Sequence, residues 1–224
     1  MVFVALFLQQ IVLFDPHIKH RQGGLYMNLV ISGPSGSGKG TLTSLLLLEG
    51  EFVKSVSYTT RIKREKEING RDYYFVEREC FEKLFKDNYF FEVTEYGGNY
   101  YGIPKKNLSL MNNEKDVIFD LVTTSGINIK KESKDTCLVY VMPPTLEELN
   151  RRRGNRGDER LKEDVVQMLQ AQNYYDFIIK NDDLKEAYEQ LKMIISVYQH
   201  NSLVKNENFM DNFFEPQHKK IFKK

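Results

Sequence analysis

The sequence predicts an α/β fold in which a mostly parallel sheet is flanked by helices on both faces. Short apolar runs alternate along the chain with segments of helical periodicity, which is the pattern of a parallel sheet. The 224 residues, 41% of them hydrophobic, suffice for one such domain with inserted segments. A net charge of +1 argues against a protein that acts by covering nucleic acid with positive charge.

The first strand is expected at Leu29–Ser32, an apolar run that leads into a glycine-rich segment. A helix follows through GTLTSLLLLE and ends at Gly50, because glycine commonly terminates helices. Phe52–Val56 is expected to form a second strand, and SYTTRIKRE a polar loop. The dipeptide Asn69–Gly70 predicts a hairpin turn, with DYYFV as the strand that leaves it.

A short helix, RECFEKLFKD, and an aromatic strand at Tyr89–Val93 are expected next, followed by the turn-rich EYGGNYYGIP. Val117–Val122 and Cys137–Met142 are short, continuous and rich in β-branched residues, which predicts central strands. The segment from about Ser57 to Ile103 breaks the alternation of strand and helix. We interpret it as an insert with antiparallel strands, carried on the main sheet.

The second half continues with a helix, an arginine-rich loop and another helix, TLEELNRRRGNRGDERLKEDVVQMLQAQ. A last strand is expected at Ile178–Ile179, and a helix from Leu184 to about Tyr198. The domain therefore spans residues 27–199, and residues 200–224 form a polar tail.

Residues 1–26 are expected to be an extension that the domain does not need, with a targeting segment as the alternative. The opening MVFVALFLQQIVLF is apolar but too short to span a bilayer. The two cysteines form no C-x-x-C pair, so we expect reduced thiols and a cytoplasmic location. Chemistry based on histidine is not expected, because all four histidines lie in the terminal stretches: His17, His20, His200 and His218.

The stretch LVISGPSGSGKGT, residues 29–41, contains the pattern G-x-x-x-x-G-K between a predicted strand and a predicted helix. Backbone N–H groups of such a loop and the helix N-terminus form an anion site, and Lys39 is expected to reach the β- and γ-phosphates of a nucleotide. The alternative is a glycine-rich turn with a surface lysine. The expected ATP-binding residues of the loop are Gly33, Pro34, Ser35, Gly36, Ser37, Gly38, Lys39, Gly40 and Thr41.

The position after the lysine usually carries Ser or Thr, but here it is Gly40, and Thr41 follows. Thr41 is rotated by about 100° around the helix from the usual hydroxyl. We expect it to contact an α-phosphate or a metal-bound water. Adenylate kinases resemble this arrangement with a G-K-G-T of their own, which favours a nucleotide site of the small-kinase kind.

Six motifs in order, GPSGSGKGT, SVSYTTRIKRE, NGRDYYF, FFE, GGNYYG and IIKNDDL, closely resemble those of guanylate kinases. The resemblance runs from about Met27 to Tyr198. It implies a P-loop NTPase core, a GMP-binding insert at residues 57–103 and a helical lid at residues 146–168. It also implies the reversible transfer of the γ-phosphate of ATP to GMP with Mg²⁺.

The residues of the insert suit a nucleoside monophosphate. The guanidinium groups of Arg61 and Arg64, with the phenols of Tyr73 and Tyr101, match a dianionic phosphate. Without the neighbouring motifs, a solvated basic loop would be the favoured interpretation. The resemblance adds Ser57 to this phosphate site.

The resemblance also assigns Glu92 to the guanine base. A carboxylate can accept hydrogen bonds from both N1–H and the 2-amino group of guanine, whereas adenine offers no such pair of donors. The alternative is an ordinary glutamate at the end of a strand.

Two positions depart from the family pattern. Ile103 stands where guanylate kinases place a Ser or Thr that donates to guanine O6, so we expect GMP to bind more weakly, by roughly tenfold. Asp120 begins DLVTTSG, where the family reads Asp-x-Asp and then Gln-Gly, so the second aspartate is missing or shifted. Asp120 is still expected near magnesium with Thr41, in contact through water.

The segment NRRRGNRGDER is rich in arginine, which is typical either of a solvated or nucleic-acid-binding patch or of a kinase lid. Arg152 and Arg156 match lid arginines of the family, whereas Gln167 replaces a later one. Arg153 or Arg160 could compensate for that loss. Asn181 matches a family residue beside the adenine of ATP.

The sequence therefore predicts a guanylate kinase whose catalytic residues are Lys39, Arg61, Arg152 and Arg156. ATP and GMP are the expected partners of a monomer or weak dimer, with no membrane or nucleic acid bound. Two alternatives stay open: a catalytically silent guanylate-kinase-like interaction module, and a nucleoside monophosphate kinase with a different base preference.

Overall fold

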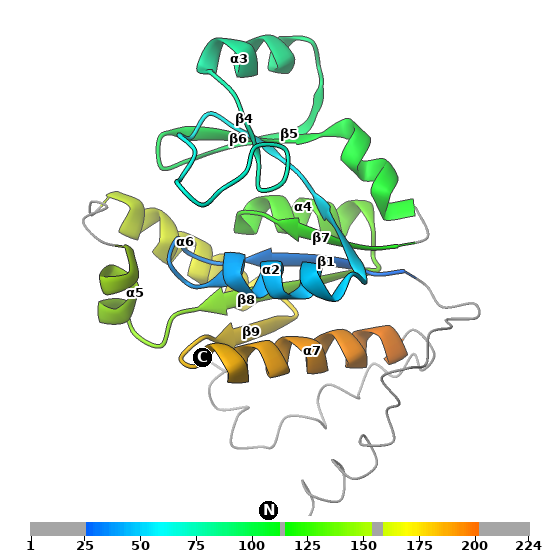
Figure 1. Ribbon diagram of the computed structural model, residues 1–224, viewed down its shortest axis with the longest axis vertical. Coiled ribbons are helices and arrows are strands. Elements are labelled where there is room, and N and C mark those ends of the chain that lie inside the picture. Colours follow the sequence, from blue (N-terminus) through cyan, green and yellow to red (C-terminus); the bar gives the residue numbers. More distant parts are fainter. Residues whose placement is uncertain (1–25, 113–114, 154–158, 202–224) are drawn as a thin grey trace, which may run out of the picture.

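The structure is a computed structural model that describes residues 26–112, 115–153 and 159–201. Except for Tyr26, the predicted N-terminal extension lies outside the described residues, as does the predicted tail from residue 202 onward. The described residues form one large sheet with helices on its two faces and a smaller sheet next to it (Figure 1).

The large sheet has five strands in the order β2-β7-β1-β8-β9, and every neighbouring pair is parallel. This confirms the predicted mostly parallel sheet. Its central strand β1 is buried along its whole length, which explains its continuous apolar sequence. The strands are β1 (Asn28–Ser32), β2 (Phe52–Ser55), β7 (Asp116–Asp120), β8 (Thr136–Met142) and β9 (Phe177–Lys180).

Helices cover both faces of this sheet, as the alternation of side chains along β1 requires. Leu29 and Ile31 belong to a core cluster with residues of α2 (Lys39–Glu49) and α7 (Leu184–Asn201). Val30 belongs to a second cluster on the opposite face, which includes Ile129 of α4 (Thr123–Glu132).

Two further helices, α5 (Leu146–Arg153) and α6 (Glu159–Tyr174), occupy the predicted lid region, and α6 packs against α4. Helix α4 was not predicted from the sequence. Among the described residues, no helix has the length and apolar character needed to cross a membrane.

The smaller sheet has four strands in the order β4-β3-β6-β5 and corresponds to the predicted insert. Helix α3 (Arg78–Lys86) packs on it through Phe81, whose ring stacks on Phe90 at 4.6 Å between centroids. The 3₁₀ helix η1 (Lys105–Asn112), also not predicted, leads back to the large sheet. The strands are β3 (Tyr58–Thr59), β4 (Tyr74–Phe75), β5 (Phe90–Tyr96) and β6 (Asn99–Pro104).

The hairpin predicted at Asn69–Gly70 is wrong, because β3 and β4 on its two sides pair in parallel. Gly70 does adopt a turn conformation with φ 80°, and its N–H donates to the carbonyl of Tyr73 at 2.8 Å. The hairpin of this sheet instead joins β5 to β6 through Gly97 and Gly98, at φ 57° and 72°. The segment EYGGNYYGIP is therefore mostly strand.

Met27, the first residue of the predicted domain, is held in the core and at the sheet. Its side chain is buried, and its backbone nitrogen donates to Asp116 Oδ1 at 2.7 Å. A chain that begins at Met27 would carry an ammonium group there, which can donate to the same carboxylate. We expect that shortened chain to fold with an unfolding free energy within about 0.5 kcal/mol of the full chain. Urea denaturation and GMP turnover of both chains check this, and loss of either property would refute a dispensable extension.

Candidate active site

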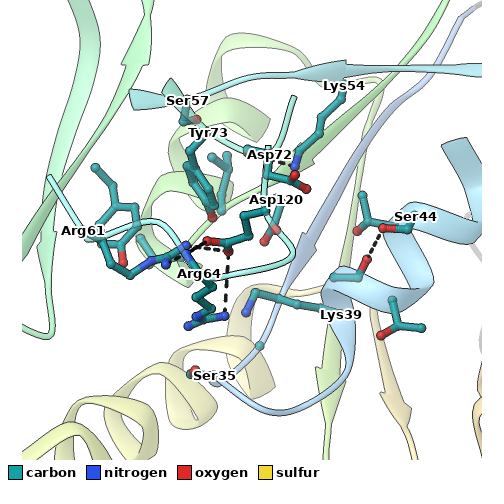
Figure 2. A pocket seen from close by; sticks show the side chains of 18 of the residues that line it. Ser35, Lys39, Ser44, Lys54, Ser57, Arg61, Arg64, Asp72, Tyr73 and Asp120 are labelled. Carbon is teal, nitrogen blue, oxygen red and sulfur yellow. Dashed lines mark hydrogen bonds and ion pairs between the residues drawn. The ribbon is translucent and has the colours of Figure 1, made fainter. Parts of the chain in front are cut away.

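A cavity of about 1020 Å³ lies between the carboxyl ends of the large sheet and the smaller sheet. Its walls come from the glycine loop, from the loop after β3, from β6 and from the ends of β7 and α4. Ligands of open α/β sheets commonly bind outside the carboxyl ends of the strands. The cavity is therefore the candidate active site (Figure 2).

The loop between β1 and α2 has the backbone of a phosphate-binding loop. Gly33, Gly36 and Gly38 have φ 151°, 94° and 92°, a region that side chains other than glycine rarely adopt. A Cβ on Gly33 would lie 2.3 Å from the carbonyl oxygen of Val141, so the loop also depends on close backbone approach. Gly38 has no side chain to cap α2, and the N-terminus of a helix is a favourable place for an anion.

Lys39 is the first residue of α2 and lines the cavity with Gly40 and Thr41. Figure 2 shows its side chain extending toward the opposite wall, where Arg64 lies. The ammonium group of a lysine in this place can stay in contact with the oxygens of a phosphate group that passes from one wall to the other.

Asn181 holds the glycine loop from the end of β9. Its buried amide Nδ2 donates to the carbonyl of Ser37 at 2.8 Å, and a Cβ on Gly38 would lie 2.1 Å from the same nitrogen. The predicted contact with adenine remains a prediction, since Asn181 is not among the residues that line the cavity.

Arg152 lies on the same side of the molecule as the glycine loop. Its Nη1 donates to the carbonyl of Asn181 at 3.1 Å, and its Nε to Glu148 Oε1 at 2.6 Å. It does not line the cavity in this arrangement of the described residues. The other predicted lid arginine, Arg156, lies outside the described residues.

The opposite wall brings together all the residues predicted to hold the acceptor phosphate. The Arg61 guanidinium lies 5.6 Å from the centre of the Tyr73 ring, which sets these two side chains next to each other. The hydroxyl of Ser57 is buried and has no hydrogen-bond partner within the described part of the chain. The residues of this wall are Ser57, Arg61, Arg64, Tyr73 and Tyr101.

Arg61 is fixed by Glu67, a residue that the sequence analysis did not select. Nη1 and Nη2 of Arg61 donate to the two carboxylate oxygens at 3.0 and 2.7 Å, and the backbone N–H of Arg64 donates to the same group at 2.8 Å. Burial alone would raise the pKa of Glu67, but the hydrogen bonds from Arg61 and Arg64 outweigh it and lower that pKa. In the sequence, Glu67 is one of several charged residues in RIKREKE, and a spacing of six from Arg61 is too weak a signal to indicate a pair.

Because the pKa of Glu67 is lowered on folding, the pair stabilises the fold above the ordinary carboxyl pKa of 4.5 and loses this effect as the pH falls further. We expect Glu67→Gln to reduce the free energy of unfolding by about 1–2 kcal/mol at pH 7 and by less at pH 3. Urea denaturation at both pH values measures this. A difference between the variants that does not shrink at pH 3 would contradict a charged pair.

Tyr73 and Asp120 lie together in the middle of the cavity (Figure 2). Burial, followed by the negative charge of Asp120, raises the pKa of Tyr73 well above its ordinary value. The phenol therefore stays protonated and can donate to a phosphate.

Asp120 suits a metal ion that arrives with a nucleotide. Its Oδ1 is buried and has no hydrogen-bond partner within the described residues. Those residues contain no cluster of three or more His, Cys, Asp or Glu side chains that could hold a metal by themselves. One carboxylate together with phosphates and water is a usual set of ligands for Mg²⁺, so the residues present fit this ion.

Glu92 does not itself line the cavity, but it is one hydrogen bond away from it through Ser125, so its predicted contact with guanine remains a prediction. Its Oε1 accepts from the hydroxyl of Ser125 at 2.6 Å, and its Oε2 accepts from Asn128 Nδ2 at 3.2 Å. Ile103 pairs with Glu92 across β5 and β6, and both Ile103 and Ser125 line the cavity. Ser125 was not predicted as a site residue, because it lies in the segment where α4 was not predicted.

Gln167 has a role that an arginine could not fill. Its Oε1 accepts hydrogen bonds from the backbone N–H and the hydroxyl of Thr123, both at 3.2 Å. It thus caps the first turn of α4 from α6, and a guanidinium has no acceptor for this purpose.

Comparisons with known proteins point to one family. The family model described as guanylate kinase matches residues 26–198. A guanylate kinase of Clostridium tetani is 39% identical over 175 residues, which cover 75% of this chain and 84% of that protein. A guanylate kinase of Lactobacillus johnsonii is 38% identical, with 75% and 86% covered. The crystal structure of guanylate kinase from Anaplasma phagocytophilum matches with a TM-score of 0.65 and 32% identity, covering 79% of this chain and 87% of that one.

Proposed function

This chain belongs to the guanylate kinase family, and we propose from this premise that its cavity transfers the γ-phosphate of ATP to GMP, giving ADP and GDP. The observation that carries the proposal is that two sets of residues suited to bind phosphate line one cavity. The glycine loop with Lys39 forms one wall, and Arg61, Arg64 and Tyr73 face it from the other (Figure 2). The chain is therefore an ATP:GMP phosphotransferase.

The donor side would hold ATP through backbone amides of residues 33–41 and through Lys39. The acceptor side would hold the GMP phosphate through two guanidinium groups and three hydroxyls. The acceptor is already an anion, so no general base is needed, and catalysis consists of positioning and charge neutralisation.

Mg²⁺ would enter with ATP, and Asp120 and Thr41 would face it through water. When bound, the ion would neutralise charge on the transferred phosphate. Asp120 supports this assignment because its buried Oδ1 lacks a partner among the described residues.

The lid would supply the remaining positive charge. Arg152 and Arg156 are the proposed lid cations, and Arg152 lies next to the glycine loop through its bond to the carbonyl of Asn181. Arg152 would exchange Glu148 for a phosphate when ATP arrives.

The two cysteines, Cys80 and Cys137, are both free thiols, which supports a reducing compartment and hence the cytoplasm. ATP and GMP are the proposed partners of a monomer or weak dimer.

A silent interaction module is the weaker alternative, since both the glycine loop and the acceptor residues line one cavity. A different base preference is the second alternative, and Ile103 is the observation that favours it. An ADP-release assay with GMP, dGMP, AMP, dAMP and CMP as acceptors distinguishes the three. We expect turnover with GMP and dGMP, whereas no turnover would favour the module and turnover with AMP a different preference.

A further inference from the structure

At the end of the cavity where the guanine base would bind (the base end), β6 presents a side chain without a hydroxyl. The side chain at this position, Ile103, is 3% exposed and belongs to the apolar cluster that contains Val117 and Phe119 of β7. An isoleucine packed in this way cannot donate a hydrogen bond to a base. The O6 atom of guanine, an acceptor, would have no partner on this strand.

Helix α4 places a different hydroxyl at the same end. Ser125 is 4% exposed and lines the cavity, and its Oγ lies 2.6 Å from Glu92 Oε1. Asn128, three residues later on the same face of the helix, donates to the other oxygen of Glu92 at 3.2 Å. The serine hydroxyl is thus held next to the carboxylate that would accept the N1–H and 2-amino protons of guanine.

Thr94 completes a chain of hydroxyl groups at this place. Its Oγ1 lies 3.0 Å from the hydroxyl of Ser125 and 3.2 Å from Glu92 Oε1. A hydroxyl has one proton to donate and two lone pairs that accept. Ser125 can therefore accept from Thr94 while its own proton points to a third group.

We propose that Ser125 recognises guanine O6 in place of the hydroxyl missing at Ile103. When the N1–H of the base binds Glu92 Oε1, it replaces Ser125 on that oxygen. Ser125 then donates to O6, the atom next to N1, and Thr94 donates to Ser125. This inference rests on the proposed function. The hydrogen bond from Ser125 would offset the weaker GMP binding that Ile103 alone would cause.

The test compares three acceptors that differ in one group each. GMP carries O6, IMP keeps O6 but lacks the 2-amino group, and 6-thio-GMP keeps N1–H and the 2-amino group but replaces O6 by sulfur, a weak acceptor. We expect Ser125→Ala to raise the KM for GMP and for IMP by about three- to tenfold, with little change for 6-thio-GMP. Ser125→Thr, which keeps a hydroxyl, should stay closer to the wild type, and Ser109→Ala, at an exposed serine of η1, is the matched control.

Two results would overturn the proposal. An equal rise in KM for all three acceptors would mean that Ser125 only holds Glu92 in place, and no rise for GMP would mean that it does not contact the base. Both results require a wild-type enzyme that phosphorylates GMP. Absence of that activity would instead contradict the proposed function.

Discussion

Replacing Lys39 by alanine is expected to reduce turnover with ATP and GMP by about 10²-fold or more, equivalent to about 3 kcal/mol in the activation free energy. The backbone amides of the glycine loop would remain, so the nucleotide would still find an anion site. The cation that can stay with the γ-phosphate during transfer would be gone. Because the side chain extends from the first turn of α2 into the cavity, its removal should not unfold the domain.

The measurement is the steady-state rate of ADP release, combined with calorimetric binding of GMP. We expect GMP to bind Lys39→Ala within about twofold of the wild type, since the acceptor wall is formed by other residues. Lys185→Ala, at an exposed lysine of α7, serves as the control and should leave turnover unchanged. Near-normal turnover of Lys39→Ala would contradict the assignment of the glycine loop to the donor phosphates.

The core of this fold could be predicted because its strands are continuous apolar runs. Val117–Phe119 and Cys137–Val141 are fully buried in β7 and β8, so their sequence reflects burial on both faces of a parallel sheet. The glycine loop could be predicted for a similar reason, since its backbone conformation requires specific glycines. A short stretch of sequence is enough to predict each of these two features.

Helix α4 could not be predicted in this way. Its sequence begins TTSGIN, and Thr, Ser, Gly and Ile are weak helix formers. The helix depends on tertiary packing, with Ile129 fully buried and Gly126 so close to its neighbours that a Cβ would lie 2.3 Å from the Tyr175 hydroxyl. Because Ser125 and Asn128 belong to this helix, their place at the base end of the site could not be predicted either.

The pair of Arg61 and Glu67 was missed for another reason. Arg61 and Glu67 both lie in the loop between the short parallel strands β3 and β4, where the folded chain brings their side chains together. Asn69–Gly70 indicates a turn, but no pattern in the sequence indicates how the loop before it folds. Predicting the residue types of the phosphate site was therefore possible, whereas predicting their partners was not.

Replacing Glu92 by glutamine is expected to lower kcat/KM for GMP by about 10²- to 10³-fold, because a hydrogen bond to a charged group contributes about 1.5–3 kcal/mol and guanine offers two donors to this carboxylate. A glutamine keeps one acceptor, but its amide N–H₂ would face the second donor of the base. The wild-type carboxylate finds no donor pair on adenine, so the neutral amide should not penalise AMP further. The preference for GMP over AMP should therefore fall by a similar factor.

Glu95→Gln is the control, since Glu95 belongs to the same strand and is exposed. The kcat/KM values for GMP and AMP of both variants decide the question, and an unchanged ratio in Glu92→Gln would exclude Glu92 as the residue that reads the base. The acceptor 6-thio-GMP separates this effect from that of Ser125. It keeps N1–H and the 2-amino group, so Glu92→Gln should impair it about as much as GMP, whereas Ser125→Ala should not. One side chain would then recognise the donors of the base and the other its acceptor.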